Sequence, residues 1–205
     1  RDDHEAVEFF NRCLAALLIG GVYCEAIELD GVDVGSIIDW KYLRSHHSGS
    51  AAQNTFHNHV RVRQASALEA IQLVSPPLVT MKRIETAMRD GRASVNALPE
   101  LSPEFLLRGV TGIVRHNWSR ALADLWIVVE QLTSHLWSKK VVAPSKDSTS
   151  VPGRSDQLAD TRTWTTAARH ELLHQIDVIP VRTFQKLSVA GTARHDLSHS
   201  GQHPS

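Results

Sequence analysis

The sequence has few cysteines, no excess of charge and no long apolar run. Its only cysteines, Cys13 and Cys24, are too few for a disulfide framework and lack the clustered spacing of a zinc site. Lysine and arginine (22) balance aspartate and glutamate (22), so any binding of nucleic acid must be local. The longest apolar run, residues 13–24, is far shorter than the roughly 20 residues that cross a bilayer. These absences predict a cytoplasmic protein without a membrane partner.

The composition is otherwise that of an ordinary folded domain, except for histidine. Apolar residues make up 42% of the 205 residues and charged residues 21%, which argues against a disordered or collagen-like chain. Twelve histidines are present. Histidine is the one side chain whose unperturbed pKa lies near neutral pH, so it is the first residue type to examine for acid–base chemistry.

Helical periodicity dominates the readable part of the first hundred residues. Residues 4–19 place apolar side chains at helical spacing and are followed by Gly20 and Gly21, which predict the end of that helix. A second helix is predicted over residues 78–91, with Gly91 at its end. Between them only short strands are suggested. Residues 1–100 are therefore predicted to form a partly helical N-terminal region of unknown role.

Residues 101–205 predict a separate helical domain. Ser102 and Pro103 form a helix start signal, and a long helix follows over residues 119–140. Its predicted inner seam consists of leucines and a valine at alternating spacings of three and four, namely Leu122, Leu125, Val129, Leu132 and Leu136. Residues 139–157 are rich in Ser, Pro and Lys and predict a loop. Helices over 163–177 and 182–199, the latter capped by Gly201, complete a mainly α fold.

The last predicted helix carries the most suggestive group of polar residues, RHDLSH. His195 and His199 are one helical turn apart, and Asp196 is placed to accept a hydrogen bond from His199. Arg194 lies about 140° around the helix from His199. A histidine that removes a proton from a ribose 2′-OH, with a guanidinium that neutralises the phosphate, would cleave RNA without a metal. A full cycle needs an acid as well as a base, supplied by His195 or by a second chain.

A plainer interpretation is a polar helix end. Histidine and arginine near a helix C-terminus interact favourably with the negative end of the helix dipole, by about 0.3–1 kcal/mol each. Spacing alone favours this interpretation, because an arginine and a histidine separated by four residues form a loose pattern. The same pattern occurs earlier in the chain, at Arg169 and His174.

The stretch ARHDLSHSG resembles the signature of the HEPN superfamily, small all-α domains marked by an arginine, a polar residue that is often asparagine, and then a histidine. The resemblance covers residues 102–201, about half of the chain, in an order of helices similar to that of bacterial defence proteins such as the ApeA-like group. It implies a HEPN-like bundle of four to five helices over residues 101–205. His195 stands where asparagine is commoner.

The resemblance also implies an activity, a partner and a setting. A domain of this kind would be a metal-independent endoribonuclease without a cofactor, acting on RNA as a homodimer, in toxin or anti-phage defence. Arg194 would stabilise the phosphate and His199 would be the catalytic histidine, with His195 and Asp196 beside them. Glu130 or Asp124 would be candidate partners for Arg194. Because many HEPN domains have lost catalysis, a silent RNA-binding or dimerisation module is the alternative.

Residues 170–174 also match the zincin pattern HELLH. Two histidines one turn apart, His170 and His174, would bind Zn²⁺ with Glu171 as the general base. The third ligand would have to come from His195, Asp196 or His199, and no third histidine stands at the metzincin spacing. A helix with Leu172 and Leu173 inward is the structural alternative. The cluster of His46, His47, His57 and His59 is predicted to be a solvated loop.

Overall fold

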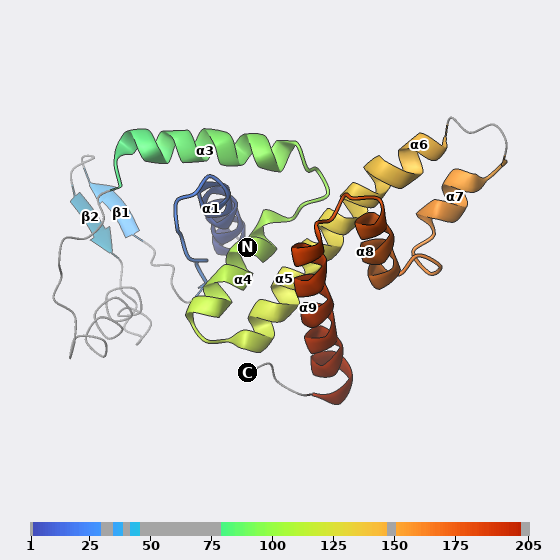
Figure 1. Ribbon diagram of the computed structural model, residues 1–205. Coiled ribbons are helices and arrows are strands. Elements are labelled where there is room, and N and C mark those ends of the chain that lie inside the picture. The colour runs from blue at the N-terminus through green and yellow to red at the C-terminus, as the bar shows by residue number, and fades with distance from the viewer. Residues whose placement is uncertain (1, 30–34, 39–41, 46–78, 147–150, 202–205) are drawn as a thin grey trace.

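The computed structural model describes residues 2–29, 35–38, 42–45, 79–146 and 151–201, and these residues are mostly helical (Figure 1). The described strands are a short antiparallel pair, β1 (Gly35–Ile38) and β2 (Tyr42–Ser45). The helices are α1 (Asp2–Ile19), α3 (Met81–Asn96), α4 (Pro103–Val114), α5 (Trp118–Trp137), the π-helix η3 (Ser138–Val142), α6 (Ala143–Ser145), α7 (Arg154–Ala159), α8 (Thr166–Gln175) and α9 (Val181–Ser200). The predicted mainly α fold class is confirmed.

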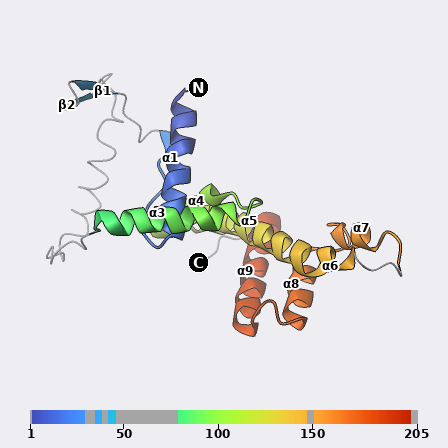
Figure 2. The ribbon, with the colours of Figure 1, turned by 90° about the horizontal axis from the view of Figure 1, so that it is seen from above.

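Small residues allow α1 and α3 to cross closely, as Figure 2 shows. A Cβ atom added to Gly20 would collide with the carbonyl of Ala87, and one added to Gly91 would collide with the carbonyl of Ala16. Gly91 is therefore a packing residue in the interior of α3, which continues to Asn96. The prediction that Gly91 ends this helix is wrong, because glycine also permits close approach of two backbones.

Helix α4 packs against α1 on one side and against α5 on the other. It begins at Pro103 after Ser102, as predicted, although the Ser102 side chain makes no cap hydrogen bond. Its backbone N–H donates to Gln131 instead, at 3.0 Å. A tight turn joins α4 to α5, with Asn117 accepting a hydrogen bond from the backbone of Arg120 as the N-cap of α5. Because α1 and α4 pack together, the predicted boundary between residues 100 and 101 lies between two helices that are in contact.

The buried face of α5 differs from the predicted seam. Its buried residues are Ala121, Trp126, Val128, Thr133 and Trp137. Leu132 of the predicted seam is 36% exposed. The two tryptophans offer more apolar area than leucine, and their face is the one that α8 and α9 cover.

Helical structure also runs further than predicted after α5. The π-helix η3 and the short helix α6 occupy residues 138–145, which include the first part of the predicted loop over 139–157, and α7 covers residues 154–159. Val141 and Val142 of η3 pack against the cluster around Trp137, together with Leu158 of α7. This apolar contact stabilises the helical conformation of residues 138–145, although the segment is rich in Ser, Pro and Lys.

A core cluster of apolar residues joins α5, α8 and α9. It is centred on Trp137, Leu173 and Ile179, and Phe184 and Leu187 of α9 pack against it. The break between α8 and α9 lies at residues 176–180, with Asp177 at a positive φ of 58°; it includes the predicted break at residues 178–180, although α8 is shorter than the predicted helix over 163–177. Gly201 ends α9 in the left-handed conformation, also as predicted. The fold therefore places both copies of the Arg–His pattern on one helical hairpin.

Candidate functional site

The RHDLSH residues lie in the last two turns of α9. Arg194, His195 and His199 are exposed, and Asp196 is partly exposed. The imidazole centroids of His195 and His199 are 4.4 Å apart, with ring planes inclined by 43°. Figure 1 shows this end of α9 extending beyond α8 toward the C-terminus. The structure thus brings two exposed imidazoles together on one helix face.

The predicted hydrogen bond between Asp196 and His199 does not occur among the hydrogen bonds of the described residues. The side chain next to His199 is His195, and the Asp196 carbonyl accepts the backbone N–H of Gly201 at the helix end. Asp196 is therefore a neighbour of the imidazole pair rather than the group that fixes its tautomer.

The acids suggested as partners of Arg194 have other contacts. Glu130 accepts a hydrogen bond of 2.7 Å from the indole N–H of Trp126. Asp124 lies 3.9 Å from Arg108 and 3.8 Å from Arg120, and burial raises the pKa of its carboxyl despite these two cations. In the part of the chain that the structure describes, no acid forms an ion pair with Arg194.

The earlier copy of the pattern, on α8, lies in the interior. His170 is 4% exposed, and its Nε2 lies 2.7 Å from the hydroxyl of Thr133. That hydroxyl donates its single proton to the carbonyl of Val129, also at 2.7 Å, so Nε2 of His170 must donate to Thr133. Burial lowers the pKa of His170, while Glu130 opposes this effect. His170 is therefore a neutral, hydrogen-bonded core residue at pH 7.

Arg169 is also held inside the protein. It is 6% exposed, and its guanidinium carbon lies 5.7 Å from the ring centre of Trp137. One terminal nitrogen donates to the hydroxyl of Ser134 at 3.4 Å, and Nε has no hydrogen-bond partner. Burial lowers the pKa of Arg169, and the charge of Asp160 opposes this effect. Arg169 serves the packing of α8 on α5 through its stem and ring contact.

His174 completes the α8 copy as a second structural histidine. Its Nδ1 donates to the carbonyl of Ile179 at 2.9 Å, and its ring stacks on Phe184 at 4.8 Å. The zinc interpretation needs His170 and His174 free to bind one ion, but Nε2 of His170 already faces Thr133. Glu171 is exposed and accepts a hydrogen bond from Gln175. No group of three potential metal ligands exists among the described residues, and His46, His47, His57 and His59 lie outside them.

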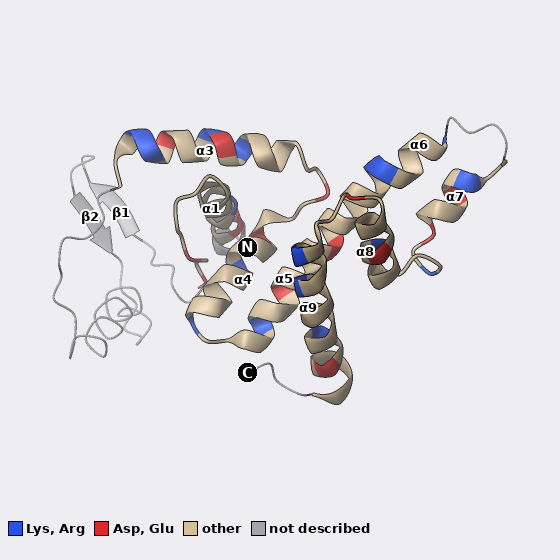
Figure 3. Ribbon diagram, in the orientation of Figure 1, with Lys and Arg blue, Asp and Glu red and all other residues tan. Residues whose placement is uncertain are grey.

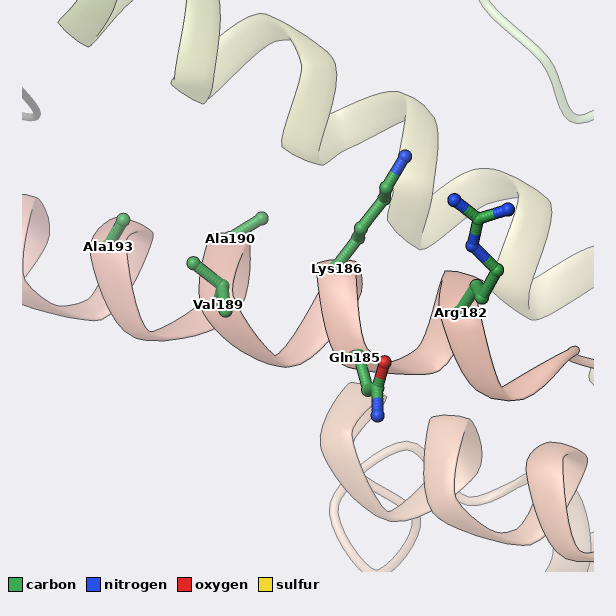
Figure 4. A pocket seen from close by; sticks show the side chains of 6 residues that line it. All are labelled: Arg182, Gln185, Lys186, Val189, Ala190 and Ala193. Carbon is green, nitrogen blue, oxygen red and sulfur yellow. The ribbon is translucent and has the colours of Figure 1, made fainter.

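Two cations on the same helix as the imidazole pair were not predicted as site residues from the sequence. Arg182 and Lys186 line a shallow, open groove of about 420 Å³ along α9, together with Gln185, Val189, Ala190 and Ala193 (Figure 4). The available signal was a spacing of four residues between Arg182 and Lys186, which places them on one row of the helix surface.

The helices that the structure describes contain no apolar stretch sufficient to span a bilayer. Comparison of the chain with protein-family models, with curated proteins and with solved structures finds no match in any of the three. The similarity to HEPN domains therefore remains a prediction, and the candidate site stands on the geometry of α9.

Proposed function

We propose that the end of α9 is the active site of a metal-independent endoribonuclease of the HEPN type. The observation that carries the proposal is the pair of exposed imidazoles, His195 and His199, at 4.4 Å. Cleavage of RNA through its own 2′-OH needs one group that accepts a proton and another that donates one. Two neighbouring histidines supply both functions near neutral pH without a metal.

In the proposed reaction His199 is the base and His195 the acid. Neutral His199 takes the proton from the ribose 2′-OH, and the oxygen attacks the adjacent phosphorus. Protonated His195 gives its proton to the departing 5′-oxygen as the P–O bond breaks, which leaves a 2′,3′-cyclic phosphate. The guanidinium of Arg194 binds the phosphate oxygens and neutralises the charge that develops on them.

We also propose that the active form is a homodimer. Val181 at the start of α9 is 52% exposed. It precedes His199 by 18 residues, which is about five full turns, so both lie on the same side of the helix. Association of two chains through this side would bring their histidines toward a shared cleft. Light scattering coupled to size-exclusion chromatography tests this: we expect a dimer that Val181→Glu converts to a monomer.

The test of the proposed function is cleavage of single-stranded RNA in EDTA. We expect products that end in 2′,3′-cyclic phosphate, formed by the intact chain and not by His199→Ala. Products with 3′-hydroxyl ends, or activity that EDTA abolishes, would replace the proposal with a metal-dependent mechanism.

One observation favours a second candidate, a silent RNA-binding or dimerisation module. Arg194 and His199 project about 140° apart on α9, so one phosphate must bridge two sides of the helix end to contact both. RNA binding or dimer formation without any cleavage would select this candidate. A toxin or defence setting is proposed on the HEPN resemblance alone, and expression in bacteria of the intact chain beside His199→Ala tests it by comparing growth.

A further inference from the structure

A row of basic side chains follows α9 toward the imidazole pair. Arg182, Lys186, Ala190 and Arg194 are each four residues apart, so they form one ridge on the helix surface. At 1.5 Å per residue the steps between them are about 6 Å along the axis. Blue segments along α9 in Figure 3 mark the three cations of this ridge. We call Arg182, Lys186, Ala190 and Arg194 the α9 ridge.

The α9 ridge borders a surface that is apolar between its charges. Val189 is 72% exposed, and Ala190 and Ala193 are partly exposed beside it. In Figure 4 Arg182 and Lys186 extend from one side of α9, Ala190 projects on that side as well, and Gln185 points to the other. A ligand lying here would meet positive charge and apolar surface alternately.

The charges of the ridge are not neutralised within the described part of the chain. Several arginines of the described residues pair with an acid, among them Arg12, Arg89, Arg108, Arg115 and Arg120. No described acid forms an ion pair with Arg182, Lys186 or Arg194. Helix α9 carries these three cations and a single acid, Asp196. Its surface therefore favours an anionic ligand.

We propose that the α9 ridge binds the phosphate backbone of a single-stranded RNA, an inference that rests on the proposed ribonuclease function. Because Arg194 and His199 project about 140° apart, the strand crosses the end of the helix between the ridge and the imidazole pair. Cations in a row bind successive phosphates in a sequence-independent way. A duplex hides the faces of its bases, whereas the unstacked bases of a single strand can contact apolar side chains such as Val189. A second copy of this chain fits less well, because two such ridges would bring like charges together.

The test is RNA binding by full-length chains that carry His199→Ala, so that the RNA stays intact during the measurement. Fluorescence anisotropy of labelled oligouridine in EDTA gives the dissociation constant as a function of salt. Arg182→Glu/Lys186→Glu is compared with Lys139→Glu/Lys140→Glu, which makes the same charge change at exposed lysines of η3. We expect the first pair to weaken binding about tenfold per site and to lower the salt slope by about 1.4. The control pair should leave both nearly unchanged.

Three outcomes would contradict the proposal that the α9 ridge binds single-stranded RNA. Equal losses in the two double variants mean that the net charge acts rather than this surface. Unchanged RNA affinity, together with a change in oligomeric mass, makes the surface a protein interface. Binding of duplex RNA as tight as that of the single strand removes the single-strand assignment.

The proposal that the α9 ridge binds RNA and the proposal that the imidazole pair cleaves it can be contradicted independently. If the double variant loses affinity and no chain cleaves RNA, the ridge stands and the catalytic proposal is wrong. If the intact chain cleaves RNA and the double variant binds as tightly as before, the catalytic proposal stands and the ridge is wrong.

Discussion

Helices α8 and α9 carry the same pattern, an arginine and a histidine separated by four residues, and place it in opposite surroundings. On α8, Arg169 is 6% exposed and His174 is hydrogen-bonded and stacked. On α9, Arg194 and His199 are exposed, and among the contacts of the described residues His199 has only a second histidine beside it. The α8 copy holds the hairpin to α5, and the α9 copy is open to a ligand.

The difference comes from the neighbours of each helix. Trp137 and Phe184 pack on the rings and stem of the α8 copy, Ile179 accepts a hydrogen bond from His174, and Thr133 binds the neighbouring His170. The end of α9 extends beyond α8, so comparable partners are missing there among the described residues (Figure 1). Buried polar groups of this kind are retained for packing and hydrogen bonding, whereas exposed ones are free to meet a substrate. A function can thus be assigned to a sequence pattern only after its surroundings in the fold are known.

Substitution of His199 on α9 and of His174 on α8 tests the difference between the two copies most directly. We expect His199→Ala to lower the rate of RNA cleavage by about 10²- to 10⁴-fold, because it removes the proposed general base. Its midpoint of thermal unfolding should stay unchanged, since the side chain is exposed. The matched variant His174→Ala should lose stability and keep the cleavage rate of the folded fraction. If His174→Ala is the more damaging change to cleavage, the site belongs to α8.

Substitution of Arg169 should affect stability, and substitution of Arg194 should affect activity. Arg169→Ala removes a buried stem and the hydrogen bond to Ser134, so we expect the free energy of unfolding to fall by about 1–3 kcal/mol. Arg169→Met keeps the volume and removes the buried charge, and it should cost less. Chemical denaturation measures both. Equal losses in the two variants would show that the charge of Arg169, rather than its packing, stabilises α8.

Arg194→Ala should leave the unfolding free energy unchanged and lower catalysis. We expect kcat to fall about tenfold to a hundredfold and the affinity for RNA to fall less, because the guanidinium is needed most when charge develops on the phosphate. Steady-state kinetics with Arg194→Lys as the partial replacement measures this. A loss in kcat/KM that comes entirely from KM would make Arg194 a binding contact only.

The sequence predicted the helices well and their surroundings poorly. The start at Ser102-Pro103, the break near Ile179 and the cap at Gly201 depend on local backbone preferences, and these appear in the structure. Gly91 was misassigned because a helix cap and a close helix crossing both require a residue without a side chain. The π-helix η3 was missed because its apolar contact with Trp137 is tertiary.

The candidate site shows the same division. The spacing of His195 and His199 predicted their proximity, because one helical turn brings such residues together. Spacing could not show which copy is buried, since the partner of His170 is Thr133, 37 positions earlier in the chain. Contacts across such separations depend on the packing of α5 against α8, which no local pattern encodes.

The smallest expected effect is a pH dependence of stability that belongs to the α8 copy. Burial lowers the pKa of His170 below its unfolded value of about 6.5, so the unfolded chain binds more protons than the folded one as the pH falls below that value. The free energy of unfolding should therefore be greater at about pH 7.5 than at about pH 5.5, with the loss ending once the pH is below the folded pKa. His170→Gln, measured by urea denaturation at both pH values, should reduce this difference. The groups that face the ring are Thr133, Trp126 and the nearby charge of Glu130. An unchanged difference in His170→Gln would assign the pH dependence to another group, whereas a reduced one would assign the acid sensitivity of the fold to the buried copy on α8.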